Sequence, residues 1–133
     1  MCGIFCFFDL PETSLPASRD VALEQARLLR HRGPDWSGLW AGGRAIMAHE
    51  RLAIVDVLHG AQPLRSHDDR LVLAVNGEIY NHVEIRRMLG SRATFRTDSD
   101  CEVILPLYQE EGPKLVERLR GMFAFALYDV STN

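Results

Sequence analysis

The pattern of apolar and polar positions predicts strands near both ends of the chain and helices between them. Residues 2–9, CGIFCFFD, are a nearly continuous apolar run of strand length, which is typical of a strand buried on both faces. Pro11 and Pro16 indicate a loop after this strand. Ser18 is then expected to cap a helix over residues 19–31. Its expected apolar stripe consists of Val21, Ala22, Ala26, Leu28 and Leu29.

The middle of the chain predicts further strands. Residues 36–49, WSGLWAGGRAIMAH, are expected to form two short strands joined at Gly42-Gly43. LAIVDV, residues 52–57, is predicted as another apolar strand, and an exposed loop follows it. RLVLAV, residues 70–75, is predicted as a strand that ends at the turn signal Asn76-Gly77.

Two capping patterns predict helices in the second half. Asn81 and Glu84 match a capping box and predict a short helix. Ser99 and Glu102 form a second capping pair and predict another helix, in which Pro106 should produce a kink. The expected apolar face of that helix consists of Val103, Ile104, Leu107 and Tyr108.

Three short segments complete the predicted fold. Residues 93–96, ATFR, are expected to form a short strand, and residues 113–120, PKLVERLR, a short helix. Residues 122–130, MFAFALYDV, have a strong strand preference. No element follows to cover this last strand, so we expect that further sequence belongs to the domain. The pattern as a whole predicts an α+β fold.

Composition narrows the class of protein. The 133 residues suffice for one domain, and 47% hydrophobic with 25% charged residues is typical of a globular protein. A net charge of −3 provides no basic face for nucleic acid or an anionic membrane. We find no signal peptide pattern and no apolar run of membrane-spanning length. Three cysteines give no disulfide framework, so reduced thiols and a cytoplasmic location are expected.

Cys2 is the first candidate for chemistry. A small residue after the initiator favours removal of Met1, which would leave Cys2 with both a thiol and a free α-amine. An α-amine titrates near pH 7.7–8.0, so it can act as a base for the thiol of its own residue. By itself this start has little specificity, because a cysteine can occupy position two without any function.

Asn76 and Gly77 are a second candidate. Their simplest interpretation is a hairpin tip, but a helix cap rather than an alternating strand follows them. An Asn side-chain amide beside a Gly backbone N–H supplies two donors, which could stabilise the oxyanion of a tetrahedral intermediate. Each such donor contributes roughly 3–4 kcal/mol to transition-state stabilisation.

Three charged residues could together recognise an α-amino acid. Arg51 is either a surface residue paired with Glu50 or a clamp for a carboxylate. Glu78 is either a solvated loop carboxylate or a ligand of an ammonium group. Asp100 either compensates the dipole in the first turn of a capped helix or is a second ligand of that ammonium group. One arginine for the α-carboxylate and two acids for the α-amine are what an amino-acid substrate requires.

The remaining histidines and cysteines favour structural roles. His31 and Arg32 are typical of a basic helix C-terminus, and His49 is either a second base or a structural hydrogen-bonding residue. Cys2 and Cys6 match no strong zinc pattern, and strand geometry places both on one face as core residues. We therefore expect no metal site.

Seven motifs in fixed order extend through essentially the whole chain, and they are far more specific than any one of them. They are MCGIF, RHRGPDWSG, HERLAIVD, GAQPL, NGEIYNH, SDCEVIL and LRGMFAFALYD. In this order they resemble the glutaminase domain of glutamine-hydrolysing asparagine synthetases, which are class II glutamine amidotransferases. Relatives that supply ammonia to sugar-phosphate or phosphoribosyl acceptors also begin with CGI, but the HERLAIVD, QPL and GEIYNH segments resemble the asparagine synthetase branch.

The resemblance implies a four-layer αββα sandwich of the N-terminal nucleophile hydrolase type. It implies Cys2 as the nucleophile, and the Asn76 side chain with the Gly77 N–H as the oxyanion hole. It further implies glutamine as the substrate, with Arg51 on its α-carboxylate and Glu78 and Asp100 on its α-amine. The pocket would be lined by the backbone of Leu52, Ala53, Ile54 and Val55.

The chain also departs from the family pattern. Cys6 replaces a usual glycine, Asp98 stands near the ammonium ligands where an uncharged residue is usual, and Pro106 is unexpected. Family members continue into further strands and a synthetase domain that uses ATP and Mg²⁺, neither of which these residues contain. No cofactor is expected in this chain, and the resemblance allows a homodimer.

The resulting hypothesis is hydrolysis of the glutamine side-chain amide, with the ammonia used to convert aspartate to asparagine in the full-length enzyme. One alternative is a non-catalytic, truncated amidotransferase module that binds an amino acid or a partner. The other is a glutaminase domain that serves a different acceptor.

Overall fold

The computed structural model describes residues 2–132, which form two antiparallel sheets and three α-helices. The first sheet has the order β1-β3-β2. Its strands are β1 (Gly3–Phe7), β2 (Trp36–Gly42) and β3 (Ala45–Arg51). The predicted hairpin is confirmed, with Gly42 opposite Ala45 and the turn at Gly43-Arg44. Gly43 has φ 52°, a left-handed conformation that glycine adopts without strain.

The second sheet has the order β4-β5-β6. Its strands are β4 (Leu64–Arg65), β5 (Leu71–Ile79) and β6 (Gly121–Asp129). β5 pairs with β6 along its whole length, whereas β4 covers only Val72 and Leu73. The β6 strand predicted from residues 122–130 is therefore confirmed. Within residues 2–132, one edge of β5 has no neighbouring strand beyond Leu73.

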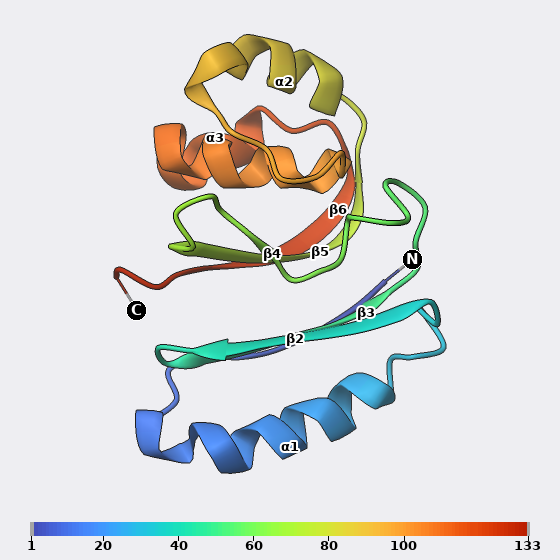
Figure 1. The fold of residues 1–133 in the computed structure, drawn as a ribbon, viewed down its shortest axis with the longest axis vertical. Coiled ribbons are helices and arrows are strands. Elements are labelled where there is room, and N and C mark those ends of the chain that lie inside the picture. The colour runs from blue at the N-terminus through green and yellow to red at the C-terminus, as the bar shows by residue number, and fades with distance from the viewer. Residues whose placement is uncertain (1, 133) are drawn as a thin grey trace.

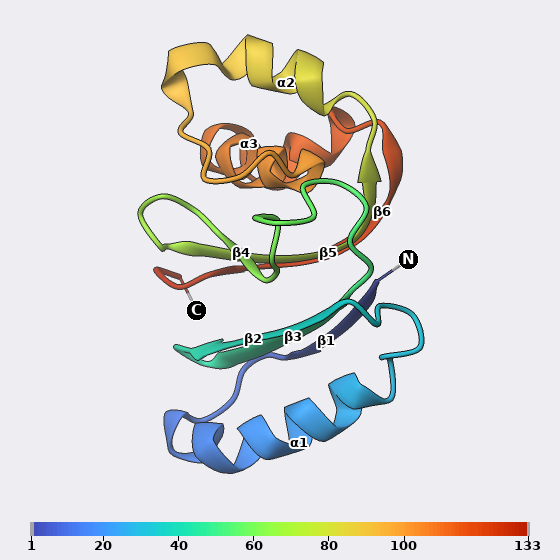
Figure 2. The same ribbon diagram turned by 45° about the vertical axis from the view of Figure 1, so that its right-hand side comes forward.

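The helices lie outside the two sheets. Figures 1 and 2 show α1 (Leu15–Arg27) against the outer face of the first sheet, with α2 (His82–Leu89) and α3 (Ile104–Glu111) beyond the second. Short 3₁₀ segments are η1 (Glu12–Ser14), η2 (Gly90–Arg92), η3 (Asp100–Val103) and η4 (Gly112–Glu117). The α+β prediction is confirmed at this level.

Two apolar layers hold these elements together. The outer core lies between the second sheet and its helices, and it includes Leu71, Leu73, Val75, Ile104 and Leu107. The inter-sheet layer consists of Ala45, Met47, Val72, Ala74 and Tyr128, with Ile4, Cys6, Trp40, Ala126 and Val130 packed against it. Alternate residues of β5 therefore face opposite layers. Cys6 is a core residue, as predicted, and its burial raises the pKa of its thiol to about 11.

Several element predictions were wrong. Residues 52–57 are a loop rather than a strand, and residues 93–96 are irregular because Glu102 accepts the Arg96 and Thr97 N–H groups. β5 continues through Asn76-Gly77, because β6 pairs with it as far as Ile79.

The predicted helices exist, but their ends differ. The first begins at Leu15 with Pro16 in its opening turn, where a missing N–H is tolerated, and Val21 and Leu28 are exposed. Asn81 does not cap α2, because its side chain bonds Arg118 and Arg120 instead.

The second capping pair and the kink also differ from the prediction. Ser99 accepts the Cys101 N–H, as a cap does, but Glu102 does not complete the box. Pro106 lies in the first turn of α3, directly after η3, so it removes no helical hydrogen bond. The expected helix over residues 113–120 is the 3₁₀ segment η4.

Within residues 2–132, no helix is long and apolar enough to cross a membrane. In the same part of the chain, no three His, Cys, Asp or Glu side chains converge as a ligand set for a metal ion.

Candidate active site

The space between the sheets changes from apolar to polar at one end. In β3, Met47 belongs to the inter-sheet layer, and strand alternation places His49 and Arg51 on the same face. In β5, Val72 and Ala74 face this layer, so Asn76 and Glu78 continue the same face. Cys2 lies directly before β1, two residues from Ile4, which packs against this layer. Strand period alone therefore gathers the polar candidates at one end.

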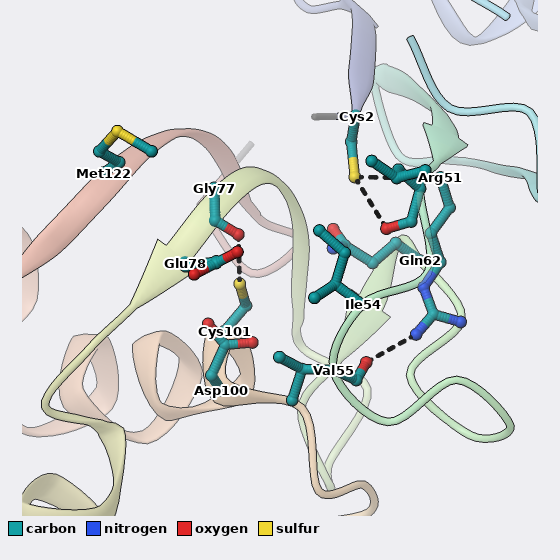
Figure 3. Close-up of a pocket in the computed structure, with 11 residues that line it drawn as sticks. Cys2, Arg51, Ile54, Val55, Gln62, Gly77, Glu78, Asp100, Cys101 and Met122 are labelled. Carbon is teal, nitrogen blue, oxygen red and sulfur yellow. Dashed lines mark hydrogen bonds between the residues drawn. The ribbon is translucent and has the colours of Figure 1, made fainter.

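A pocket of about 560 Å³, including its open mouth, lies at this polar end. Figure 3 shows Cys2 entering it from one side and Gly77 with Glu78 facing it from another. The lining residues are Cys2, Arg51, Leu52, Ile54, Val55, Gln62, Gly77, Glu78, Asp100, Cys101 and Met122. Both sheets, the loop after β3 and the start of η3 thus contribute to one cavity.

The Cys2 thiol is held by backbone at the mouth of this pocket. The Leu52 N–H donates to Sγ at 3.4 Å, and Sγ lies 3.7 Å from the Leu52 carbonyl oxygen. The Arg32 Nε–H donates to the Cys2 carbonyl at 3.0 Å. Arg32 therefore fixes the Cys2 backbone, a function that its interpretation as a basic helix end did not predict.

The free edge of β5 forms one wall of the pocket. The Val130 N–H donates to the Arg70 carbonyl, and the Tyr80 N–H donates to the Arg120 carbonyl. Because hydrogen-bonded pairs alternate along an antiparallel ladder, the even residues of β5 bond β6. The N–H and C=O groups of Val75, Gly77 and Ile79 consequently point to the opposite edge, where β4 has ended. Among residues 2–132 the Gly77 N–H has no acceptor, so it can donate to a ligand in the pocket.

Gly77 and Asn76 have different surroundings. Gly77 has φ 154°, and a Cβ at this position would overlap the Met122 carbonyl, so only glycine fits. Asn76 is not among the lining residues, but its side chain lies between the sheets on the Glu78 face. Its Oδ1 is buried and has no hydrogen-bond partner within residues 2–132. Rotation of the carboxamide would place an N–H donor at the same position.

Arg51 organises the loop that follows β3. Its guanidinium donates to the carbonyl oxygens of Val55 at 2.9 Å, Asp56 at 2.7 Å and Val57 at 3.2 Å. Two of its five N–H groups remain without an acceptor in the described chain. The alternative pairing of Arg51 with Glu50 is wrong, because Glu50 binds Arg30 and Ser37 on the opposite face of β3.

The same loop is fixed at its other side by Asp56. The Asp98 N–H donates to its carboxylate at 2.8 Å, and this bond, with those from His59, lowers the pKa of Asp56. Asp98 itself is exposed and is not among the residues that line the pocket.

Two carboxylates and a thiol form the acidic wall. Asp100 is buried, and its Oδ2 accepts the Ile79 N–H at 2.7 Å. The Glu78 carboxylate has no hydrogen bond or ion pair within residues 2–132 and is available to a cationic group. Cys101 lies 3.7 Å from the Gly77 carbonyl oxygen. Burial, and then the negative charge of Asp100, raise the pKa of the Cys101 thiol, so this second thiol stays protonated.

The structure brings together most of the predicted residues. Eight of them line the pocket: Cys2, Arg51, Leu52, Ile54, Val55, Gly77, Glu78 and Asp100. Ala53 does not line it, because its N–H is turned to Asp35 at 2.9 Å. His49 has the structural role that was favoured for it, with Nε2 2.8 Å from the Val75 carbonyl oxygen. Sequence reasoning missed Gln62, Cys101 and Met122, although GAQPL and SDCEVIL were recognised as motifs.

Comparison with known proteins identifies the family of this chain. A family model described as "Glutamine amidotransferase domain" matches residues 1–133. The chain belongs to this family. Among its relatives, a glutamine-hydrolyzing asparagine synthetase B from Escherichia coli is 60% identical over 129 residues, covering 97% of this chain and 23% of the relative.

Other relatives of this glutamine amidotransferase domain carry similar names. A probable glutamine-hydrolyzing asparagine synthetase from Schizosaccharomyces pombe is 53% identical over 97% of this chain and 23% of its own length. Glutamine-hydrolyzing asparagine synthetase 1 from Arabidopsis thaliana is 50% identical over 100% of this chain and 22% of its own length. The chain thus spans about a quarter of the length of these curated relatives.

Proposed function

We propose that this chain hydrolyses the side-chain amide of glutamine to glutamate and ammonia. The observation that carries the proposal is one pocket that holds the Cys2 thiol, the unpaired Gly77 N–H, Arg51 and the acids Glu78 and Asp100. A nucleophile, an oxyanion donor and ligands for both charged ends of an amino acid are the components that this reaction needs.

The reaction begins at the Cys2 sulfur. Sγ attacks the carboxamide carbon of glutamine, and the C–S bond forms as the C=O electron pair moves to oxygen. The Gly77 N–H and the Asn76 amide donate to this oxyanion. The α-amine of Cys2, freed by removal of Met1, takes the thiol proton and passes it to the leaving nitrogen. This step depends on the removal of Met1, a residue that lies outside the described part of the chain.

The tetrahedral intermediate collapses to a thioester, which water then hydrolyses. Its C–N bond breaks, ammonia leaves, and a γ-glutamyl thioester remains on Cys2. Water adds to the thioester carbon, its proton returns through the amine to sulfur, and the C–S bond breaks to release glutamate. The Leu52 N–H, 3.4 Å from Sγ, stabilises the thiolate that leaves.

The two ends of the pocket orient glutamine for this attack. Arg51 binds the α-carboxylate through the N–H groups that the loop carbonyls leave free. Glu78 and the second oxygen of Asp100 bind the α-ammonium. Leu52, Ile54 and Val55 form the wall along the aliphatic part of the substrate. Ala53 supports this wall through its bond to Asp35 rather than by contact.

The larger context of the chain is also a proposal. The outward placement of helices around two facing sheets supports a four-layer αββα sandwich of the N-terminal nucleophile hydrolase type. The relatives' names, which join asparagine synthesis to glutamine hydrolysis, support asparagine formation as the use of the ammonia. We propose that a synthetase domain that uses ATP and Mg²⁺ receives this ammonia and converts aspartate to asparagine. We propose that this synthetase chemistry takes place in a domain other than these 133 residues, and that the protein can form a homodimer. Three free thiols support a cytoplasmic location.

Alkylation by 6-diazo-5-oxo-norleucine, a glutamine-like reagent, tests the proposed function. We expect loss of Met1 and one adduct on Cys2, mapped by peptide mass spectrometry, together with glutamate production from glutamine. Cys2→Ala should abolish the adduct and the glutamate production. The control Cys6→Ala should retain the adduct and the glutamate production, because Cys6 packs in the inter-sheet layer. Surviving hydrolysis in Cys2→Ala would refute the nucleophile. Retained Met1 without an adduct would favour the non-catalytic module.

A further inference from the structure

Gln62 makes an unusual pair of hydrogen bonds to β5. Its Oε1 accepts the Val75 N–H at 2.6 Å, and its Nε2 donates to the Val75 carbonyl at 3.2 Å. The side chain is buried and lies at the pocket wall (Figure 3). A carboxamide that bonds both the N–H and the C=O of one residue reproduces what a neighbouring strand does.

The register of the sheet explains this geometry. Leu64 lies opposite Leu73 in the antiparallel β4–β5 pair, so continuation by two residues would place position 62 opposite Val75. The backbone is not paired there, because β4 begins only at Leu64. The Gln62 side chain thus takes the place of the missing strand for one more residue pair.

The backbone of Gln62 lies against the other sheet. A Cβ on Gly38 of β2 would overlap the Gln62 carbonyl, so the absence of a side chain at Gly38 admits this contact. His49 of β3 also bonds the Val75 carbonyl, at 2.8 Å. Gln62 and His49 therefore tie the strand that carries Gly77 to the sheet that carries Cys2.

We propose that Gln62 is a positioning residue for the oxyanion donor, an inference that rests on the proposed function. Val75 is the last residue of β5 with a partner for both its N–H and its C=O on this edge. The next N–H on the same edge is that of Gly77, about 7 Å further along the strand. Because Gln62 fixes Val75, the Gly77 N–H two residues later stays directed into the pocket and at a constant distance from the Cys2 thiol. Gln62 does not touch the reacting atoms and acts through the backbone.

Two substitutions of similar volume separate hydrogen bonding from packing. Gln62→Met removes both bonds but fills the space, and Gln62→Glu places a second acceptor against the Val75 carbonyl. We expect kcat for glutamine hydrolysis to fall about 10- to 100-fold in both, because a displaced oxyanion donor loses much of its effect. KM should stay within about twofold, because Arg51, Glu78 and Asp100 still bind the substrate. Gln25→Met, on the exposed face of α1, is the matched control and should retain wild-type kinetics.

Amide hydrogen exchange provides a readout that is independent of catalysis. The Val75 N–H should exchange at least about tenfold faster in Gln62→Met than in wild type, whereas Leu73, bonded by β4, should not change. Unchanged kcat with faster Val75 exchange would overturn the positioning role while leaving the proposed function intact. A parallel rise in KM and global exchange would show a structural role only and would also overturn it. Equal inactivity of wild type and Gln25→Met would instead refute the proposed function on which the inference depends.

Discussion

At the scale of single residues, His49 should make stability depend on pH. Burial first, and then Arg51, lower the pKa of His49, although the Val75 carbonyl opposes this. That carbonyl can only accept, so Nε2 carries the proton and the buried Nδ1 has none and no partner in residues 2–132. Protonation is therefore easier in the unfolded chain, whose histidine titrates near 6.5. Stability is fully present above pH 6.5 and falls as the pH decreases towards the lower folded pKa.

Urea unfolding followed by tryptophan fluorescence between pH 5 and 8 measures this effect. His49→Gln keeps a donor for the Val75 carbonyl and should flatten the decrease below pH 6.5. Once the pH is below the folded pKa, each pKa unit of the shift has lowered the free energy of unfolding by about 1.4 kcal/mol relative to its value above pH 6.5. His31→Gln, on an exposed residue, should keep the wild-type slope. Equal slopes in wild type and His49→Gln would show that this histidine does not titrate with folding.

The sequence indicates which residues form the site better than it indicates which contacts hold them in place. Strand period was sufficient to place Cys2 and Cys6 on one face. Arg32, Gln62 and Cys101 were missed because their partners are distant in sequence: Cys2, Val75 and Gly77, respectively. No local pattern encodes such contacts, whereas the family resemblance located the nucleophile and the charged ligands without them.

At the scale of elements, the loop over residues 52–60 should depend on the shape of the Arg51 side chain. Three carbonyls converge on one planar guanidinium, which a lysine ammonium cannot match in direction. Arg51→Lys should therefore open the loop and speed chymotrypsin cleavage after Leu58, which is 85% exposed, by about tenfold. Arg65→Lys, on an exposed residue of β4, should be cleaved at the wild-type rate. Unchanged cleavage at Leu58 would mean that charge alone organises the loop.

Element type was predictable where apolar period and pairing agree. The β2–β3 hairpin and β6 formed as expected because each has a continuous antiparallel partner. LAIVDV failed because its carbonyls bond Arg51 instead of a strand, which leaves Ile54 and Val57 59% exposed. The strand predicted over residues 70–75 was too short, because Asn76 and Gly77 pair with β6 instead of forming a turn. Propensity was overridden in each case by tertiary hydrogen bonds.

At the scale of the whole molecule, the two sheets should differ in how they are stabilised. The outer core consists of residues between Leu64 and Leu127, so the second sheet and its helices share a large apolar layer of their own. Beneath the first sheet, α1 contributes only Ala22 and Ala26 as buried residues. The first sheet must therefore depend on the inter-sheet layer, where the Tyr128 ring lies 5.6 Å from the Trp40 ring at a tilt of 49° and its hydroxyl accepts the Arg44 N–H at 2.9 Å. Sequence patterning could not predict this asymmetry, because both sheets are similarly apolar.

Tyr128→Ala should uncouple the first sheet from the rest of the molecule. Loss of the buried ring costs about 3–5 kcal/mol, and most of that loss should fall on β1–β3, which have no second core of comparable size. Native-state hydrogen exchange should show lower protection in β3, with β5 and α3 close to wild type. Tyr108→Ala, at the margin of the outer core, should produce the opposite pattern and lower protection in α3 first. A uniform loss of protection in both variants would mean that the sheets unfold as a single unit, and the dependence argued from the two cores would be wrong.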